Sequence, residues 1–324
     1  MIDPDSSVTT SAVTGAGVIG VAQVAAGNAR AAAVRRPLTA LLSRPLADHQ
    51  LVAVANGQSI NWQQLRQRVN RWQQRLAGHN GDTLAVFLHD SFEFAAVLLA
   101  LWHSNKAALL PGDCLPATVQ QLQGQVSGLI GDFAAQDQLP HVRLDSVATS
   151  DSSLSTTAAH KLHRNQLAVI VLTSGSTGEP KPVPFRLGQL DDELAMHEQL
   201  WGEQAGAALV VGTVSHQHIY GLLWRVLWPL TGNRPLLSEC CHYPEDLLAH
   251  ASRWPQRVLI TTPTHLTRLP ENFRQACAES GSWQLVISST APLAADSSRI
   301  AGYHRNLRQL GNRRHCLAPS NARP

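Results

Sequence analysis

The chain has 324 residues, of which 44% are hydrophobic and 15% are charged, and a formal net charge of +3. This length and composition are those of an ordinary globular protein, and the longest apolar run, Phe94 to Trp102, is too short to span a bilayer. All of the excess positive charge lies in arginines after residue 298, so the rest of the chain offers no basic face to DNA or RNA.

The leader over residues 1–36 is small, polar or alanine-rich, and we expect it to be poorly ordered. It contains Gly15-x-Gly17-x-x-Gly20, the spacing of a dinucleotide-binding loop. Residues 6–14 are too polar for a buried first strand, and no acid follows about 20 residues later to bind a ribose. An NAD-dependent oxidoreductase is therefore a remote alternative, which measured binding of NADH would be needed to support.

Strand and helix patterns alternate regularly over residues 37–133. Asn56-Gly57 predicts a hairpin turn between strands at 51–55 and 58–60. Leu65, Val69, Trp72 and Leu76 then recur at helical spacing and stop at Gly78. The further elements expected are strands at 83–88, 107–110 and 128–130 and helices at 91–102 and 116–125. A polar stretch over 134–165 is interpreted as a linker between two subdomains.

The same alternation continues over residues 166–295. Strands are expected at 167–172, 208–214, 235–237, 257–261 and 284–287, and helices at 190–204, 219–230, 245–253 and 264–269. Such alternation predicts an α/β fold with doubly wound, mainly parallel sheets, whose ligands bind at the carboxyl ends of strands.

A loop rich in serine, threonine and glycine follows the strand at 167–172 and ends on a single lysine. Backbone N–H groups of such a turn form a concave anion site, hydroxyls add donors, and the lysine adds a positive charge. Pro180-Lys181-Pro182 stands where the loop of P-loop NTPases needs Gly-Lys-Ser/Thr, which excludes that class. The predicted phosphate-binding residues are Thr173, Ser174, Gly175, Ser176, Thr177, Gly178 and Lys181. A flexible surface loop is the alternative.

This loop resembles the phosphate-binding signature of the adenylate-forming superfamily, which comprises acyl- and aryl-CoA synthetases, peptide-synthetase adenylation domains and luciferases. His218-x-x-Gly221 is similar to the family's element at the junction of acyl group and phosphate. Ser289-Thr290-Ala291-Pro292 resembles its Gly-Ala-Pro loop, whose backbone lines the adenine, although the family's glycine is here Thr290. The resemblance implies a catalytic role for Lys181 and His218.

Two regions are expected to line the acyl pocket. One lies near Trp224 and Trp228, and the other near Thr264 to Leu266, where Thr262-Pro263-Thr264 resembles the start of the family's acyl-pocket helix. A helix start without this role is the alternative for the second region.

The reaction that the resemblance implies is a ligation in two steps. The carboxylate of a small fatty or aromatic acid attacks the α-phosphorus of ATP, pyrophosphate leaves, and a thiol of coenzyme A or of an acyl carrier protein then displaces AMP. The cofactors expected are ATP, Mg²⁺ and coenzyme A.

The sequence departs from the family after the Ala-Pro element. The family has a Tyr-Gly-x-Thr-Glu element there, then a ribose-binding aspartate and a C-terminal lid domain, whereas residues 296–324 form an atypical arginine-rich tail with no acid after Asp296. We therefore expect an incomplete N-terminal domain without the lid, through a shifted reading frame, a split enzyme or a natural short form. Ligation is expected to be impaired, and the alternative is an inactive nucleotide- or carboxylate-binding protein of the same fold.

Five cysteines without a Cys-x-x-Cys spacing predict neither a disulfide framework nor a zinc site. Cys240-Cys241-His242, with His216 and His218 upstream, fits no common ligand set, so buried thiols beside a strand end are the favoured interpretation and no metal-ligating residue is predicted. Since no basic segment followed by an apolar one opens the chain, no secretory signal is predicted, and a cytoplasmic location is expected.

Overall fold

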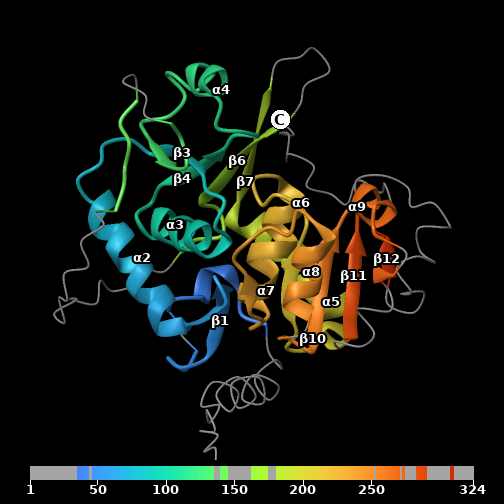
Figure 1. Ribbon diagram of the computed structural model, residues 1–324. Coiled ribbons are helices and arrows are strands. Elements are labelled where there is room, and N and C mark those ends of the chain that lie inside the picture. Colours follow the sequence, from blue (N-terminus) through green and yellow to red (C-terminus); the bar gives the residue numbers. More distant parts are fainter. Residues whose placement is uncertain are drawn as a thin grey trace, which may run out of the picture.

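The computed structural model describes residues 35–43, 46–134, 139–144, 162–173, 180–251, 253–270, 272–273, 282–289 and 307–309. Within these ranges the chain forms two β-sheets with helices packed against them, shown in Figure 1. The predicted α/β class is thereby confirmed. The glycines of the dinucleotide-like pattern lie outside the described residues, but Arg36, at the end of the predicted leader, is part of the fold and donates hydrogen bonds to Asn233 and to the Leu41 carbonyl.

The first sheet has five strands in the order β5-β3-β4-β6-β7. Their bounds are β3 Thr83–Phe87, β4 Ala107–Leu110, β5 Leu129–Gly131, β6 Leu167–Thr173 and β7 Lys181–Arg186. The helices of this half are α2 Trp62–Leu76, α3 Ser91–His103 and α4 Pro116–Gln121. All pairs are parallel except β6 with β7, which form an antiparallel hairpin around the serine- and glycine-rich loop.

The second sheet has seven strands in the order β12-β11-β10-β8-β9-β1-β2. Their bounds are β1 Leu51–Ala55, β2 Gln58–Asn61, β8 Leu209–Gly212, β9 Leu236–Leu237, β10 Gln256–Thr261, β11 Ser282–Ser288 and β12 Leu307–Gln309. Its helices are η1 Leu38–Ala40, α5 Leu187–Ala205, α6 Ile219–Gly221, η2 Leu222–Leu227, α7 Trp228–Thr231, α8 Pro244–Ala251 and α9 Pro263–Thr267. The blue β1 of Figure 1 thus completes a sheet whose other parallel strands come from the second half of the chain.

The predicted hairpin at Asn56-Gly57 is confirmed. Both residues have positive φ angles, 49° and 73°, as a two-residue hairpin turn requires, and β1 pairs with β2 in antiparallel register. The following helix α2 begins with a capping box in which the Asn61 side chain accepts from the Gln64 backbone and the Gln64 side chain accepts from the Asn61 backbone.

Two strands were not expected from the sequence. β7 carries Pro182 and Pro184, which argue against a strand except at a sheet edge, and an edge is where β7 lies. β12 lies within the predicted arginine-rich tail, and its Leu307 pairs in parallel with Val286 of β11. At least three residues of that segment therefore extend the second sheet.

The two faces of the second sheet are buried against different helices. Alternate strand residues such as Val210 and Ile260 belong to the main core, which also contains Trp224 and Leu194 of the central helices. The residues between them, such as Val211 and Leu259, pack in a second core. That second core contains Leu247 of α8 and Leu266 of α9. We call these the inner and the outer face of the sheet.

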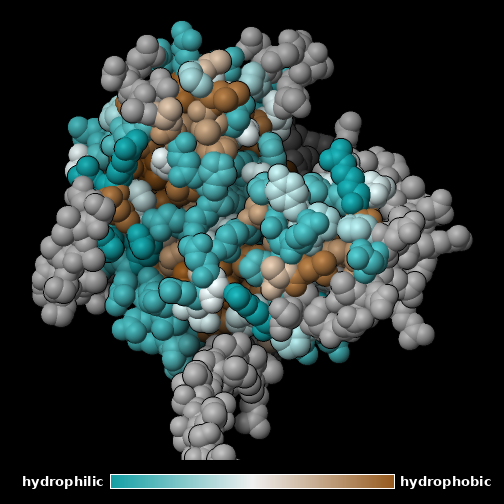
Figure 2. All heavy atoms as spheres, in the orientation of Figure 1, coloured by the Kyte–Doolittle hydropathy of each residue, from teal (hydrophilic) through white to brown (hydrophobic). Residues whose placement is uncertain are grey.

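The surface in view is largely hydrophilic (Figure 2). Large hydrophobic side chains that are exposed include Leu115, Met196, Leu200 and Tyr243. No helix in the described ranges is long and apolar enough to cross a membrane.

Candidate functional site

The mouth of the serine- and glycine-rich loop is closed by two residues paired through the backbone. Thr173 ends β6, Lys181 begins β7, and the two are register partners in the antiparallel pair. The Thr173 hydroxyl donates a hydrogen bond to the Lys181 carbonyl oxygen over 3.2 Å. Both residues are exposed. The loop therefore starts and ends at the carboxyl end of β6, where ligands of α/β sheets bind.

The remaining residues of the predicted phosphate and adenine loops lie almost entirely outside the described residues. These are Ser174, Gly175, Ser176, Thr177 and Gly178 in the first loop and Thr290, Ala291 and Pro292 in the second. Ser289 is described and stands directly after β11, at the carboxyl end of that strand.

His218 belongs to a loop of the second sheet and lies at the carboxyl ends of the strands of the first sheet. It precedes α6 and is exposed. A methyl group on Gly112, just beyond β4, would lie 3.9 Å from the His218 Cε1 atom. Because β4 is the parallel neighbour of β6, the structure brings His218 to the same end of the sheet as Thr173 and Lys181.

His216, two residues earlier, is a buried anchor. Its Nε2 lies 2.7 Å from the Leu88 carbonyl oxygen, to which it donates, and the Ser91 hydroxyl lies 3.0 Å from Nδ1. Burial, helped by the charge of Arg225, lowers the pKa of His216 to about 3. The ring therefore stays neutral and holds the loop in place, which leaves His218 as the histidine that faces solvent.

The turn after His218 depends on a close backbone contact. A Cβ atom on Gly221 would lie 2.0 Å from the Ser215 carbonyl oxygen, so only glycine fits without a shift of the backbone. Tyr220 fixes the same turn to the sheet, since its hydroxyl lies 3.0 Å from the carbonyl oxygens of both Thr261 and Ile287. Burial raises the pKa of the Tyr220 phenol, which thus remains a donor.

Arg225 is a buried cation beneath the His218 loop. Its guanidinium donates to the Val214 carbonyl at 2.6 Å, to the Ser91 hydroxyl at 3.1 Å and to the Glu239 carbonyl at 3.0 Å. Burial lowers its pKa. Neither Tyr220 nor Arg225 was predicted from the sequence, although a single arginine inside the apolar helix 219–230 is a signal that could have marked it.

The first region expected to line an acyl pocket is filled by side chains. Trp224 and Trp228 are almost completely buried. Trp224 stacks on His197 with ring centroids 3.8 Å apart, and the Trp228 indole donates to Glu198 at 2.8 Å. The second region, at His265 and Leu266, borders a cavity of about 270 Å³ on the outer face of the second sheet.

The described ranges contain no group of three or more His, Cys, Asp or Glu side chains that could hold a metal ion. Cys241 is buried, and burial raises its pKa to about 12. Cys240 donates weakly, at 3.6 Å, to the carbonyl oxygens of Gly212 and Val214. The two thiols thus lie where the sequence predicted them, beside the end of a strand.

A family model described as AMP-binding enzyme matches residues 42–301, and the chain belongs to this family. It is 29% identical over 219 residues to 2-succinylbenzoate–CoA ligase of Lactococcus lactis subsp. lactis, covering 65% of this chain and 47% of that protein. It is 27% identical over 198 residues to phosphinothricin tripeptide synthetase PhsB of Streptomyces viridochromogenes, covering 56% of this chain and 16% of that protein.

Among solved structures, ATP-bound MatB from Rhodopseudomonas palustris matches with a TM-score of 0.70 at 20% identity, over 85% of this chain and 60% of that one. This likeness shows that the fold is that of the N-terminal part of adenylate-forming enzymes. The chain spans about half or less of the length of the curated relatives it matches.

Proposed function

We propose that this chain takes part in the ATP-dependent activation of a small fatty or aromatic carboxylic acid as an acyl-adenylate, followed by transfer to a thiol of coenzyme A or of an acyl carrier protein. The observation that carries the proposal is the pairing of Thr173 with Lys181 at the loop mouth, with His218 at the same end of the sheet. Membership of the AMP-binding enzyme family supports it.

Lys181 would bind the phosphates of ATP. An anionic carboxylate must attack an anionic phosphate, and further charge gathers on the departing pyrophosphate, so fixed positive charge and N–H or O–H donors lower the barrier. Backbone pairing holds the Lys181 main chain at the loop mouth, so the side chain extends from a fixed point beside the loop. The loop hydroxyls and N–H groups, with Ser174 and Thr177 among them, would add donors.

His218 would orient the carboxylate and then border the path of the thiol. Its exposed ring can donate a hydrogen bond to a carboxylate oxygen, and the buried groups around it fix its position. The backbone of Ser289 to Pro292 would lie along the adenine. Mg²⁺ would enter as the complex with ATP and supply charge neutralisation on the phosphates.

An inactive nucleotide- or carboxylate-binding protein is the second candidate. It is favoured by the stretch from residue 297 to residue 324, which holds no acid that could act as the family's magnesium-binding glutamate. Both candidates require the phosphate loop to bind ATP, and only the first requires the carboxylate to react.

Calorimetric titration with ATP and Mg²⁺ tests the shared part. Lys181→Ala removes a charged donor and should weaken ATP binding by about 10- to 100-fold, since a hydrogen bond to a charged group contributes about 1.5–3 kcal/mol. Arg186→Gln removes the same charge from the other end of β7 and should leave the affinity unchanged. Equal loss in both variants would point to general electrostatics and contradict the phosphate role of Lys181.

Carboxylate-dependent exchange of labelled pyrophosphate into ATP then separates the two candidates. Exchange that His218→Ala reduces more than it reduces ATP affinity supports activation. ATP binding that depends on Lys181, without exchange for any acid in a panel of fatty and aromatic carboxylates, supports the inactive binding protein.

A further inference from the structure

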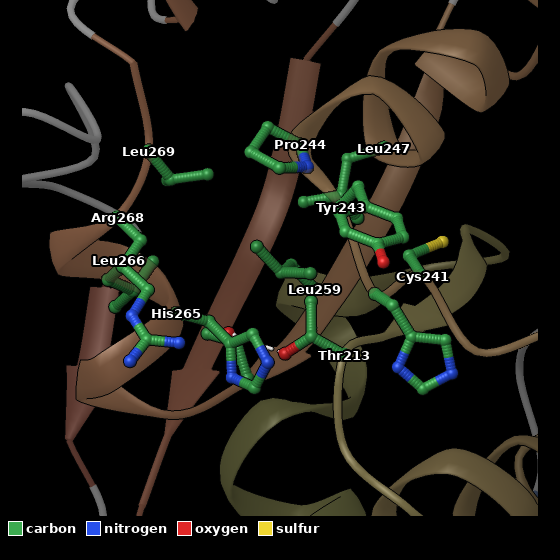
Figure 3. A pocket seen from close by; sticks show the side chains of 12 residues that line it. Thr213, Cys241, Tyr243, Pro244, Leu247, Leu259, His265, Leu266, Arg268 and Leu269 are labelled. Atoms are coloured by element: carbon green, nitrogen blue, oxygen red, sulfur yellow. Dashed lines mark hydrogen bonds between the residues drawn. The ribbon is translucent and has the colours of Figure 1, made fainter.

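The cavity on the outer face of the second sheet is enclosed by three parts of the chain: the ends of β8 and β10, the segment from Cys241 into α8, and α9 with the residues after it. Figure 3 shows its side chains from close by. The lining residues are Thr213, Cys241, His242, Tyr243, Pro244, Leu247, Leu259, Thr261, His265, Leu266, Arg268 and Leu269. A volume of about 270 Å³ is near the lower end of the range for small-molecule sites, about 300–1,000 Å³.

One part of the cavity wall is apolar. Leu247, Leu259, Leu266 and Leu269 all belong to the outer-face core, and Pro244 stands beside Leu247 in Figure 3. These side chains would cover the hydrocarbon part of a ligand and remove it from water. At the base, the hydroxyls of Thr213 and Thr261 lie 2.9 Å apart, so one of them donates a hydrogen bond to the other.

The rest of the wall carries groups that donate hydrogen bonds or bear positive charge. In Figure 3 the Arg268 guanidinium lies next to the His265 ring. Burial lowers the pKa of His265, and the charges of Arg268 and His242 lower it further. None of the lining residues is acidic, and the neighbouring Asp246 already accepts a hydrogen bond from the Tyr243 backbone. Arg268 carries a positive charge at this wall, and an anion bound beside it would pair with that charge.

The cavity lies on the opposite face of the sheet from the His218 turn. Thr261 contacts both regions, because its hydroxyl lies at the cavity while its carbonyl accepts the hydrogen bond of Tyr220 from α6. Trp224 and the rest of the helix after His218 pack in the inner core. The cavity is therefore separated by the sheet from the residues that carry the proposed reaction.

We propose that this cavity is a second ligand site, which binds a small organic anion with an apolar body, its charge beside Arg268 and His265 and its hydrocarbon part against the leucines. The site does not require the proposed ligation, and it is not the acyl pocket that the sequence suggested for residues 264–266. A ligand here would contact the end of β10, whose Thr261 also anchors the His218 turn.

Titration calorimetry with benzoate as the probe tests the site on the full chain. We expect binding to the wild type, at least tenfold weaker binding by Arg268→Gln, and no binding by Leu266→Trp, which fills the cavity. Arg75→Gln, an exposed arginine at the end of α2 in the other half of the molecule, is the matched charge control and should bind like the wild type. Benzyl alcohol has the same ring without the charge and should bind at least tenfold more weakly than benzoate.

Arg268 is exposed, so its substitution should leave the melting temperature unchanged and the loss of binding should reflect the ligand alone. Lys181→Ala and His218→Ala should keep wild-type affinity for benzoate. The proposal is overturned if the wild type does not bind benzoate, if Arg268→Gln binds it equally well, or if His218→Ala abolishes binding while Arg268→Gln retains it. The last result would assign benzoate to the reaction site.

Discussion

Replacing Gly221 by alanine should strongly destabilise the protein although it adds a single methyl group. The new Cβ would lie 2.0 Å from the Ser215 carbonyl oxygen, 2.7 Å from the Ser215 carbonyl carbon and 3.0 Å from the His216 Cα. Ordinary contacts of a methyl carbon begin near 3.4 Å, so the backbone of 215–216 must move by more than 1 Å. All three obstructing atoms are backbone, and no side chain can rotate away.

Overpacking of this kind costs about 1–3 kcal/mol and occasionally more. We expect about 3 kcal/mol for Gly221→Ala, because the obstructing segment also holds the buried His216, whose hydrogen bonds to Leu88 and Ser91 would be distorted. Urea denaturation followed by tryptophan fluorescence measures the loss as a lower midpoint at unchanged slope.

Gly78→Ala is the matched control. It makes the same chemical change in a connection after a helix, where an added Cβ meets no atom within 4 Å. Its effect should be within about 0.5 kcal/mol of zero or slightly stabilising, since alanine restricts the unfolded chain. If Gly221→Ala unfolds at the same urea concentration as Gly78→Ala, the tight contact between the turn and Ser215 does not exist and the placement of His218 loses its support.

Three further substitutions, with one control at an exposed ion pair, test buried side chains. Burial lowers the pKa of His216 in the folded state to about 3, so its contribution to stability is complete well above the unfolded pKa near 6.5 and is lost as pH falls. Urea denaturation at each pH should therefore show that wild type loses about 1.6 kcal/mol more than His216→Gln between pH 6.5 and pH 5. Tyr220→Phe removes the hydroxyl that bridges two strand ends and should lower the free energy of unfolding by about 1–2 kcal/mol in the same assay. An unchanged free energy would mean that the hydroxyl is exposed to water and does not bond the two carbonyls. Glu198→Gln leaves the buried Arg234 without its carboxylate and should lower the free energy of unfolding by about 3 kcal/mol. Asp192→Asn, in the exposed pair with Arg164, should lower it by less than about 1 kcal/mol. Equal losses would contradict the difference in burial between the two pairs.

The helices and buried strands could be predicted because their apolar periodicity depends on local sequence alone. Leu65, Val69, Trp72 and Leu76 all became the buried side of α2, and the Asn56-Gly57 turn has the positive φ angles that its residue types favour. The hairpin strand β7 could not be predicted in this way. Its two prolines are compatible with a strand only because β7 lies at an edge, and edge position is a property of the assembled sheet.

The candidate site also has a part that the sequence predicts and a part that only the structure reveals. The motif residues Lys181 and His218 could be named from the sequence, since chemistry-bearing residues recur at fixed spacing. The supporting groups could not be named. The partners of Tyr220 are backbone carbonyls, and those of Arg225 are two backbone carbonyls and the Ser91 hydroxyl, so neither set leaves a sequence pattern. The shape of the cavity could not be predicted either, because its lining residues come from three segments that only the folded chain brings together.

The prolines of β7 have a consequence for assembly. Pro182 stands opposite Leu172 and Pro184 opposite Ile170, so two backbone positions of the edge strand have no N–H group to offer. An incoming strand from another molecule would find an interrupted ladder and could not extend the sheet at this edge. The hairpin that carries the proposed phosphate loop thus also presents an edge that another chain cannot extend as a continuous ladder.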